Sequence, residues 1–199
     1  MKPSIRQKIL ETSKKLFNEK GFNNVSIQEI ASALGISKGN LTYYFRKKEE
    51  IIEAIVKECP RCDNPKAPDN LEDLDQYFHF MHNVIQENAF YFWHYAQMLQ
   101  LSTTLKDEQR KVYEIHRKTL SLSFHLLFEA GLIRDEAFPK EYERLIDALY
   151  QSIIYWLPFC ELRKEQNVSF QTHAWSIMHN ILTKQGRERL ENFTEYSHW

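Results

Sequence analysis

The sequence has few of the residues on which many enzymes and secreted proteins depend. Its 199 residues include five Gly, three Cys and six Pro. So few glycines leave little room for a phosphate-cradling loop or a nucleophile elbow, and no zinc-hydrolase signature is present. An odd number of cysteines gives no disulfide framework in a chain of this length. We therefore expect no catalytic residue, no metal site and no cofactor.

Long apolar segments are also missing from the sequence. Residues Met1, Lys2 and Pro3 lead directly into the pattern of an amphipathic helix, which leaves no place for a signal peptide. No uncharged apolar stretch approaches the length needed to span a membrane. These patterns predict a cytoplasmic protein with no membrane partner.

The formal net charge of −1 does not by itself favour binding to nucleic acid. The distribution of charge does. Residues 1–59 carry eleven Lys and Arg against seven Glu, whereas the remainder carries fifteen basic and twenty acidic residues. A basic amino-terminal part on an acidic body is typical of a protein whose one end meets phosphate.

Residues 25–51 have the pattern of two short helices joined by a tight turn, with a further helix directly after them. Ser26 precedes an apolar-periodic run and Glu29 follows three residues later, which is the spacing of a capping box. Gly35 suits the left-handed conformation found at helix ends, and Ser37 is placed to cap the second helix. This arrangement predicts a helix-turn-helix.

The second short helix presents a polar outer face. Leu41 and Phe45 lie four residues apart and should point inward, so a 100° step per residue puts Gly39 and Tyr43 on the opposite side. A small residue beside amide, hydroxyl and phenol groups is typical of a recognition helix, although a hairpin with ordinary polar surface is the alternative. The predicted base-reading residues are Gly39, Asn40, Thr42 and Tyr43, and the predicted phosphate contacts are Ser26, Ser37, Lys38, Tyr44 and Lys48.

A wider set of residues carries a family resemblance. It comprises Ile9, Leu16-Phe17, Lys20-Gly21-Phe22, Ala31, Leu34, the run from Gly35 to Leu41, Tyr44-Phe45 and Lys48-Glu49-Glu50. Through these residues the segment from Ile5 to about Ile55, a quarter of the chain, resembles the DNA-binding domain of TetR-family transcriptional regulators. The family usually has Tyr at the position of Thr42, so we expect Tyr43 or Tyr44 to take more of that contact.

The resemblance implies an all-α fold with a three-helix head, a helical body that binds a ligand and forms a dimer, and repression relieved by a small molecule. We assign residues 1–58 to the helix-turn-helix domain and residues 59–199 to the ligand-binding and dimerisation domain. The first helix is expected from about Pro3 to Lys20 with Ile5 facing inward, and a fourth helix is expected from near Lys47.

The proposed boundary is the segment 59–70, which holds three prolines and should interrupt helical structure. Cys59 and Cys62 have the spacing of a redox or zinc motif. No second Cys pair or nearby His cluster completes a set of four ligands, so incidental linker cysteines are the simpler interpretation. A thiol or metal switch, or a body that answers a protein partner, is the alternative to a small ligand.

The body is predicted to contain five helical segments. Residues 70–85 carry one clean apolar stripe, the first two turns of residues 89–101 are apolar almost all round, and a long helix covers residues 106–130. The two late helices, about 140–163 and 170–185, have more apolar surface than one partner needs. Pro158 should kink or end the first of them, and the second should end before Gly186. We expect these two helices to pair two copies in a homodimer.

Aromatic residues and histidines are concentrated in the body. Of the 27 aromatic residues 22 follow Cys59, and so do all eight His. They favour a cavity for a flat or apolar ligand, although ordinary helical core is the alternative for each residue. The predicted ligand-binding residues are Tyr77, His82, Trp93, His94, Tyr113, His116 and Trp156.

Overall fold

The computed structural model describes residues 3–58, 66–164 and 169–193. Within these ranges the regular structure is helical, apart from an isolated bridge between Ile133 and Leu182. The predicted all-α class is therefore confirmed. The chain divides into two compact units, one of Met1–Arg61 with Asn88–Arg110 and the other of Cys62–Glu87 with Lys111–Trp199. The first unit thus takes in a segment from the middle of the chain.

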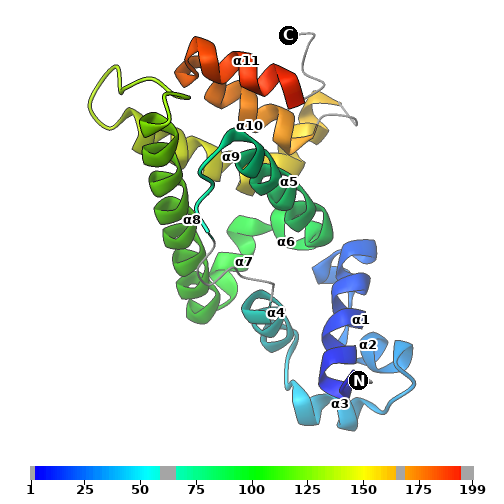
Figure 1. The fold of residues 1–199 in the computed structure, drawn as a ribbon. Helices are drawn as coiled ribbons and strands as arrows, with labels where there is room; N and C mark the ends of the chain where they lie inside the picture. The colour runs from blue at the N-terminus through cyan, green and yellow to red at the C-terminus, as the bar shows by residue number, and fades with distance from the viewer. Residues whose placement is uncertain (1–2, 59–65, 165–168, 194–199) are drawn as a thin grey trace. The chain divides into compact units, whose positions relative to one another are not determined.

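The first unit begins with a cluster of short helices around α1 (Figure 1). Helix α1 packs against α2, α4 and α6, and α2 packs against α3. The elements are α1 (Ile5–Lys20), η1 (Phe22–Asn24), α2 (Ile27–Ala33), α3 (Lys38–Tyr44), α4 (Lys48–Glu58), α6 (Ala89–Trp93), α7 (Tyr95–Leu101) and the start of α8 (Thr103–Glu129).

Two expectations for the start of the chain are corrected. Helix α1 begins at Ile5 instead of Pro3, because the extended Ser4 forms the N-cap and its hydroxyl accepts from the Gln7 N–H at 3.1 Å. Ile5 was expected to face inward but is 40% exposed, since the buried face of α1 starts one turn later at Ile9. The predicted segment boundary at Cys59, with Cys59 and Cys62, lies outside the described residues.

The segment 89–101 is not the single helix that its apolar composition predicted. It forms two helices, α6 and α7, separated at His94, whose φ of −122° and ψ of 25° are not helical. Phe90, Tyr91 and Met98 are buried, whereas Trp93 is 43% exposed. The break allows each short helix to bury one side against its own neighbours. A straight helix with apolar residues all round would need neighbours on every side.

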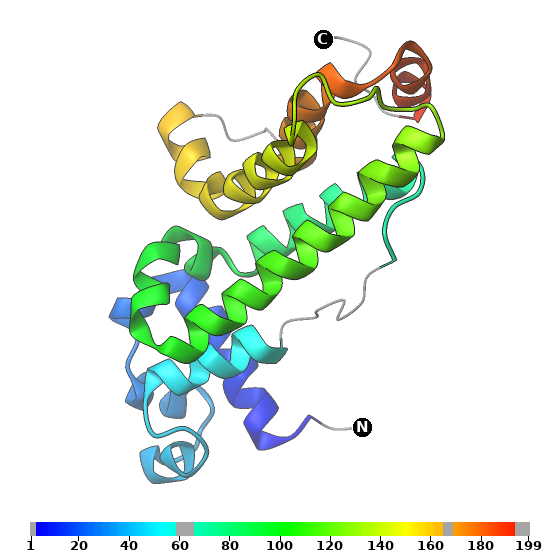
Figure 2. The same cartoon turned by 90° about the vertical axis from the view of Figure 1, so that its left-hand side faces the viewer.

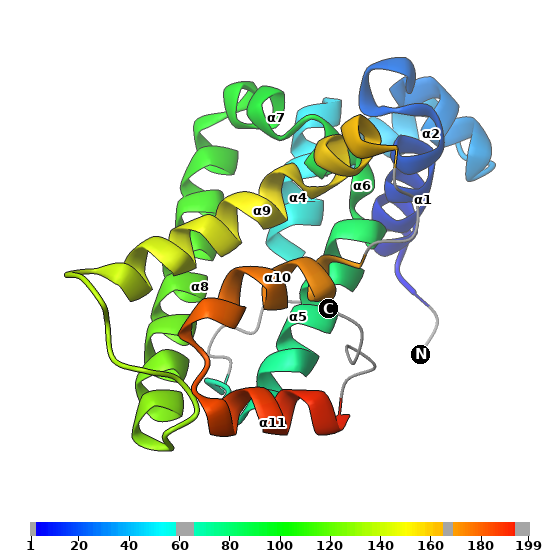
Figure 3. The ribbon, with the colours of Figure 1, turned by 90° about the horizontal axis from the view of Figure 1, so that it is seen from above.

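The second unit is built on α5 and on most of α8, which runs as one unbroken helix from Thr103 to Glu129 (Figure 2). Helix α10 packs against both α5 and α9, and α11 packs against α5 (Figure 3). The elements after α8 are α9 (Glu141–Arg163), α10 (Phe170–Met178), η2 (His179–Ile181) and α11 (Lys184–Phe193). The predicted stripe on α5 (Leu71–Glu87) is confirmed, and its buried residues are Leu71, Leu74, Phe78, Met81 and Ile85.

Of the two late helices, the first ends where the sequence predicted and the second does not. Helix α9 continues through Pro158 to Arg163, so the proline does not end it. The last predicted helix stops at Met178, and Gly186 lies inside the separate helix α11. The reason is packing: a Cβ at Gly186 would lie 2.1 Å from the carbonyl oxygen of Leu132, so only glycine lets α11 approach this backbone.

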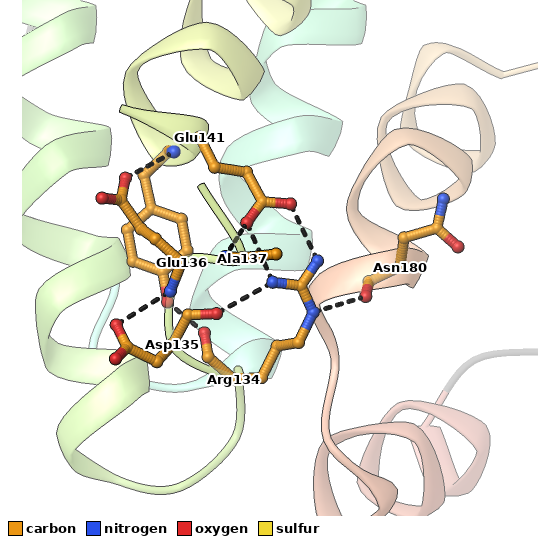
Figure 4. Close-up of polar contacts among 7 residues, drawn as sticks. Arg134, Asp135, Glu136, Ala137, Glu141 and Asn180 are labelled. Atoms are coloured by element: carbon orange, nitrogen blue, oxygen red, sulfur yellow. Dashed lines mark hydrogen bonds and ion pairs between the residues drawn. The ribbon is translucent and has the colours of Figure 1, made fainter. Parts of the chain in front are cut away.

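A partly buried ion pair between Arg134 and Glu141 fixes the connection between α8 and α9 (Figure 4). Both nitrogens at the tip of Arg134 donate to the Glu141 carboxylate, at 2.8 and 2.9 Å, and Nε donates to the Asn180 carbonyl at 3.2 Å. The Ala137 N–H donates to the same carboxylate at 2.7 Å. Because of these donors, with the guanidinium first, the pKa of Glu141 falls to about 2. One arginine therefore joins this loop to η2.

We expect Gly186→Ala to lower the free energy of unfolding of the second unit by about 1–3 kcal/mol, because the added methyl group overlaps backbone that cannot move aside. Urea unfolding followed by circular dichroism measures this change. Gly39→Ala is the matched control: its Cβ meets nothing closer than 3.9 Å, and alanine stabilises a helix by up to about 1 kcal/mol relative to glycine. Equal effects of the two substitutions would contradict the assigned contact.

Stability should also depend on the protonation of Glu141. Its folded-state pKa lies below the ordinary 4.5, so its stabilising contribution is complete above pH 4.5 and is lost as the pH falls toward about 2. In Glu141→Gln, urea midpoints should be lower near neutral pH and should fall less across that acid range. Glu188→Gln, an exposed carboxylate on α11, serves as control and should follow the wild-type curve. Parallel curves for Glu141→Gln and wild type would disprove the role.

Candidate nucleic-acid interface

Helix α2 starts with the predicted capping box, which is confirmed. The Ser26 hydroxyl accepts from the Glu29 N–H at 3.1 Å, and the Glu29 carboxylate accepts from the Ser26 N–H at 2.8 Å. This backbone donor is the main reason that the pKa of Glu29 is lowered. The reciprocal bonds fix where α2 begins and therefore the position of the turn that follows it.

The turn between α2 and α3 depends on a left-handed glycine. Gly35 has a φ of 67°, and after it the N–H of Ile36 donates to the carbonyl of Ala31 at 3.0 Å. Such a turn ends the helix sharply and satisfies its last carbonyls. Ser37 then caps α3, because its hydroxyl accepts from the Asn40 N–H at 3.1 Å. Both serines predicted to contact phosphate are thus the N-caps of short helices.

Helix α3 has one buried and one open side, as predicted. Leu41 is 0% and Phe45 5% exposed, whereas Tyr43 is 84% exposed. Tyr44 is 38% exposed, and its ring meets that of Tyr43 edge to face at 5.2 Å between centroids. Lys38, Gly39 and Asn40 are also exposed. The open side therefore presents an amide and two phenols beside a glycine that leaves room for a close approach.

Thr42 lies differently from the other residues predicted to read bases. It is half-buried, and its hydroxyl donates to the carbonyl of Gly39 at 3.1 Å within α3. Serine and threonine hydroxyls often bond in this way to the preceding turn of a helix. The bond uses the only O–H donor of Thr42 and leaves its methyl group and both oxygen lone pairs for other contacts.

Lys48, at the start of α4, is held by groups within the first unit. Its ammonium donates to the carbonyl of Phe22 at 2.8 Å and lies 4.4 Å from the centroid of that ring. Partial burial lowers the pKa of Lys48. Two of its three N–H donors are not used by the Phe22 carbonyl and can meet an external anion. Arg46 and Lys47, which the sequence analysis did not single out although they lie in the same basic run, are exposed.

The residues predicted to bind a ligand do not form one group. Tyr77 and His116 are hydrogen-bonded through the phenol and Nδ1, and burial lowers the pKa of His116 to about 4. The Tyr113 hydroxyl donates to Asp147 at 2.8 Å, and its ring meets Tyr150, which also contacts His116. These side chains make one polar and aromatic cluster on α5, α8 and α9.

The other predicted ligand residues lie elsewhere. Nδ1 of His82 accepts from the Phe170 N–H at 3.3 Å, which is a role in the core. Trp156 is 3% exposed and packs on Phe170 and His173. Trp93, the last residue of α6, and His94, between α6 and α7, belong to the first unit. Sequence position alone could not separate these environments.

A hollow of about 340 Å³ lies on the surface of α9 and α10. Its lining includes the buried Trp156 and the exposed Tyr155 and Phe159. His173 lies beside them, hydrogen-bonded to Ser152 at 3.2 Å. The lining residues are Ala148, Gln151, Ser152, Tyr155, Trp156, Phe159 and His173. The late helices thus expose aromatic surface within the predicted dimer segment.

The described residues lack two other kinds of feature. Among them, no three His, Cys, Asp or Glu side chains are grouped so as to hold a metal ion. Within the same ranges, no helix is long and apolar enough to cross a membrane.

Known proteins are similar to this chain in the sequence of its amino-terminal part and in fold over most of its length. The family model described as "Bacterial regulatory proteins, tetR family" matches residues 9–55. The probable HTH-type transcriptional regulator YttP of Bacillus subtilis (strain 168) is 40% identical over 58 residues, which are 29% of this chain and 28% of that protein. The HTH-type transcriptional regulator BetI of Yersinia pestis (strain Pestoides F) is 37% identical over 57 residues, 29% of each chain. The chain thus matches less than a third of the length of these curated relatives.

Solved structures are similar over nearly the whole chain. A TetR-family transcriptional regulator from Marinobacter aquaeolei VT8 has a TM-score of 0.80 and 25% identity, covering 96% of this chain and 97% of that one. A putative transcriptional regulator from Saccharomonospora viridis in complex with choline has a TM-score of 0.74 and 21% identity, covering 90% and 98%. The helix-turn-helix geometry, the family match and the shared fold agree: residues 9–55 match the TetR family of bacterial regulatory proteins, and the chain has the fold of TetR-family transcriptional regulators.

Proposed function

We propose that the protein is a dimeric cytoplasmic repressor that binds a double-stranded DNA operator through α3 and releases it when a small molecule binds the second unit. The observation that carries the DNA-binding part is the 84% exposure of Tyr43 on a short helix whose opposite side is buried. A large aromatic side chain held in water by a fixed helix contributes nothing to the core. It suits a helix that enters a groove.

The outer side of α3 offers groups that match base edges in the major groove. The amide of Asn40 has the donor and acceptor pair that adenine presents in reverse, and the phenol of Tyr43 can donate or accept. Gly39 allows the backbone to come close to the DNA. We assign base contacts to these residues and to the methyl group of Thr42.

Phosphate contacts are assigned to residues at the ends of the short helices. Ser26 and Ser37 stand at the N-caps of α2 and α3, where backbone N–H groups and the helix dipole favour an anion. Lys38 and Tyr44 are exposed on α3, and Lys48 begins α4. Contacts of this kind fix the register of a protein on DNA without reading its sequence.

The proposed homodimer uses α9 and α10. Tyr155 is 56%, Phe159 41% and Leu162 80% exposed on one stretch of α9, and apolar surface of this kind favours an interface. A single short helix reads only a few base pairs. A two-fold dimer doubles these contacts and reads a pseudo-palindrome with half-sites about one helical turn, or a multiple of it, apart.

The proposed inducer site is the cluster around Tyr77, His116 and Tyr150 on α5, α8 and α9. The relief of repression by a small molecule rests on the match to this family; a protein partner, or a switch at Cys59 and Cys62, is the alternative. Choline and triclosan, found in complexes of proteins with this fold, are reasonable first compounds to test. A compound that binds the folded chain raises its melting temperature.

The DNA face is tested with the duplex that the wild-type protein selects from a random-sequence pool. We expect Asn40→Ala and Tyr43→Ala to lose about 1–3 kcal/mol of discrimination between this duplex and a scrambled one, because base contacts supply discrimination. Fluorescence anisotropy at fixed salt measures both affinities. Asn83→Ala, an exposed asparagine on α5, is the control and should leave discrimination unchanged. Unchanged discrimination in both α3 variants would rule out the assigned recognition helix.

The dimer is tested without DNA. Light scattering on the wild-type protein at micromolar concentration should give the mass of two chains. Tyr155→Glu and Leu162→Glu should shift the mass toward one chain, because each puts a charge into an apolar contact. Leu122→Glu is the matched control, since Leu122 is 51% exposed on α8. A monomer mass for the wild-type protein, or equal effects at all three positions, would exclude this interface.

A further inference from the structure

Helix α9 carries a stripe of side chains that lie outside its own buried face. The stripe advances alternately by four and by three residues, which is the spacing found where one helix packs along another. Its members are Ala148, Ser152, Tyr155, Phe159 and Leu162. The last three are 56%, 41% and 80% exposed. In the described part of a single chain, the carboxyl-terminal end of this stripe is therefore apolar and open to solvent.

Side chains along the stripe grow from small to large. Ala148 and Ser152 line the hollow on α9 and α10, and Leu162 lies on the same stripe at the other end of α9. A two-fold dimer brings the same surface of both copies together. Parallel α9 helices would set large side chains against large ones and leave both hollows empty, which close packing disfavours. Antiparallel α9 helices set the large end of each copy against the small end of the other.

The occupant that fits the hollow is therefore Leu162 of a second copy, lying over Ala148 and Ser152. One stripe carries both the projecting side chain and the hollow that receives it, so the surface is self-complementary. A contact between identical copies requires this property, whereas a contact with a different protein does not. The contact occurs twice in each dimer, once at each hollow.

A histidine lies beside the small end of the hollow. His173 projects from α10, which packs against α9 (Figure 3). Its Nε2 is 3.2 Å from the Ser152 hydroxyl oxygen, and its ring lies 5.2 Å from the Trp156 ring and 6.1 Å from the Phe159 ring between centroids. The side chain is half-buried in a single copy. A leucine placed over Ser152 would remove most of the remaining water.

The groups that face α10 from its neighbouring helices make His173 the exposed titrating group of this surface. From α9, Arg163 acts on it: burial first, and then this charge, lower the pKa of His173. From α5, Asp75 accepts from the indole N–H of Trp175 at 2.8 Å, and His82 accepts from the Phe170 N–H at 3.3 Å. Both α5 side chains are thus bonded to α10 within one copy.

We infer that acid separates the two copies, because Leu162 of each copy covers the hollow of the other and encloses His173 in its neutral form. This inference rests on the proposed function and adds a regulation of its dimer. A covered imidazolium exchanges water for one hydroxyl group and apolar surface, which disfavours the charged form. The pKa of His173, already below 6.5 in one copy, falls further in the dimer. The dimer is therefore favoured at neutral pH and is lost as the pH falls below the single-copy pKa.

The dissociation constant of the dimer tests this inference in the full-length protein. Two histidines are covered in each dimer, and each can weaken association by up to about tenfold for every pH unit below its single-copy pKa. Between about pH 7.5 and about pH 5, the wild-type dissociation constant should therefore rise by about tenfold or more. Sedimentation equilibrium measures it at both pH values. An unchanged dissociation constant would overturn the inference.

His173→Gln removes the titrating group but keeps a side chain that can bond to Ser152. Its dissociation constant should be the same at both pH values. His125→Gln, on an exposed position of α8, is the matched control and should retain the wild-type dependence. His82→Gln should retain it too, since an amide oxygen also accepts from the Phe170 N–H. Full wild-type dependence in His173→Gln, or its loss in His82→Gln, would assign the effect elsewhere and contradict the inference.

Histidine NMR titration gives a second measurement that needs no change at His173. Leu162→Glu, designed to be a single copy, should contain one histidine that titrates at a higher pH than in the wild-type dimer, because its hollow is open. Identical histidine titrations in the two proteins would overturn the inference. Failure of the proposed dimer has a different signature: the wild-type protein then has the mass of one chain at about pH 7.5. A dimer that persists unchanged at both pH values leaves the proposed function standing and removes only the inference.

Discussion

The burial of Leu41 and Phe45 is the constraint on which the DNA-binding face depends. Both side chains lie in one core cluster with Ile9, Phe17 and Ile30, and full burial of such a side chain contributes about 1.5–3 kcal/mol. Turning α3 about its axis would expose them, so the core fixes which side of α3 faces solvent. The exposure of Tyr43 is the geometric consequence, since it lies half a turn away.

Polar contacts in both units join elements that are distant in sequence. In the second unit Arg134 bonds to Glu141 and to the backbone of Asn180, so one guanidinium holds a loop against a 3₁₀ turn. In the first unit Asn18 bonds to the backbone of Phe90, 72 residues away. In each case a side chain satisfies groups at a chain reversal or helix end that cannot be satisfied locally.

The fold was predicted best where a local rule decides the structure. Ser26 with Glu29, Gly35 and Ser37 fix the helix ends through bonds within a few residues, and the stripe of α5 follows from helical periodicity. The predicted helix bounds were wrong where contacts with residues distant in the sequence decide the structure. The segment 89–101 breaks at His94, and Gly186 sits inside a helix, because of the surfaces that these residues meet. No local pattern carries that information.

The same contrast between local rules and contacts of distant residues applies to the candidate sites. The sequence by itself determined that α3 would be short, capped and polar on one side, and it carried the family resemblance, because both depend on residue type and spacing over a few turns. Only the tertiary structure decided that Lys48 is held by Phe22, that α6 docks on α1, and that Tyr77 meets His116 while Trp93 lies in the other unit. Each of these contacts joins residues at least 26 positions apart in the sequence. Such pairings, and the placement of Trp93 in the first unit, are set by packing and not by residue type or spacing.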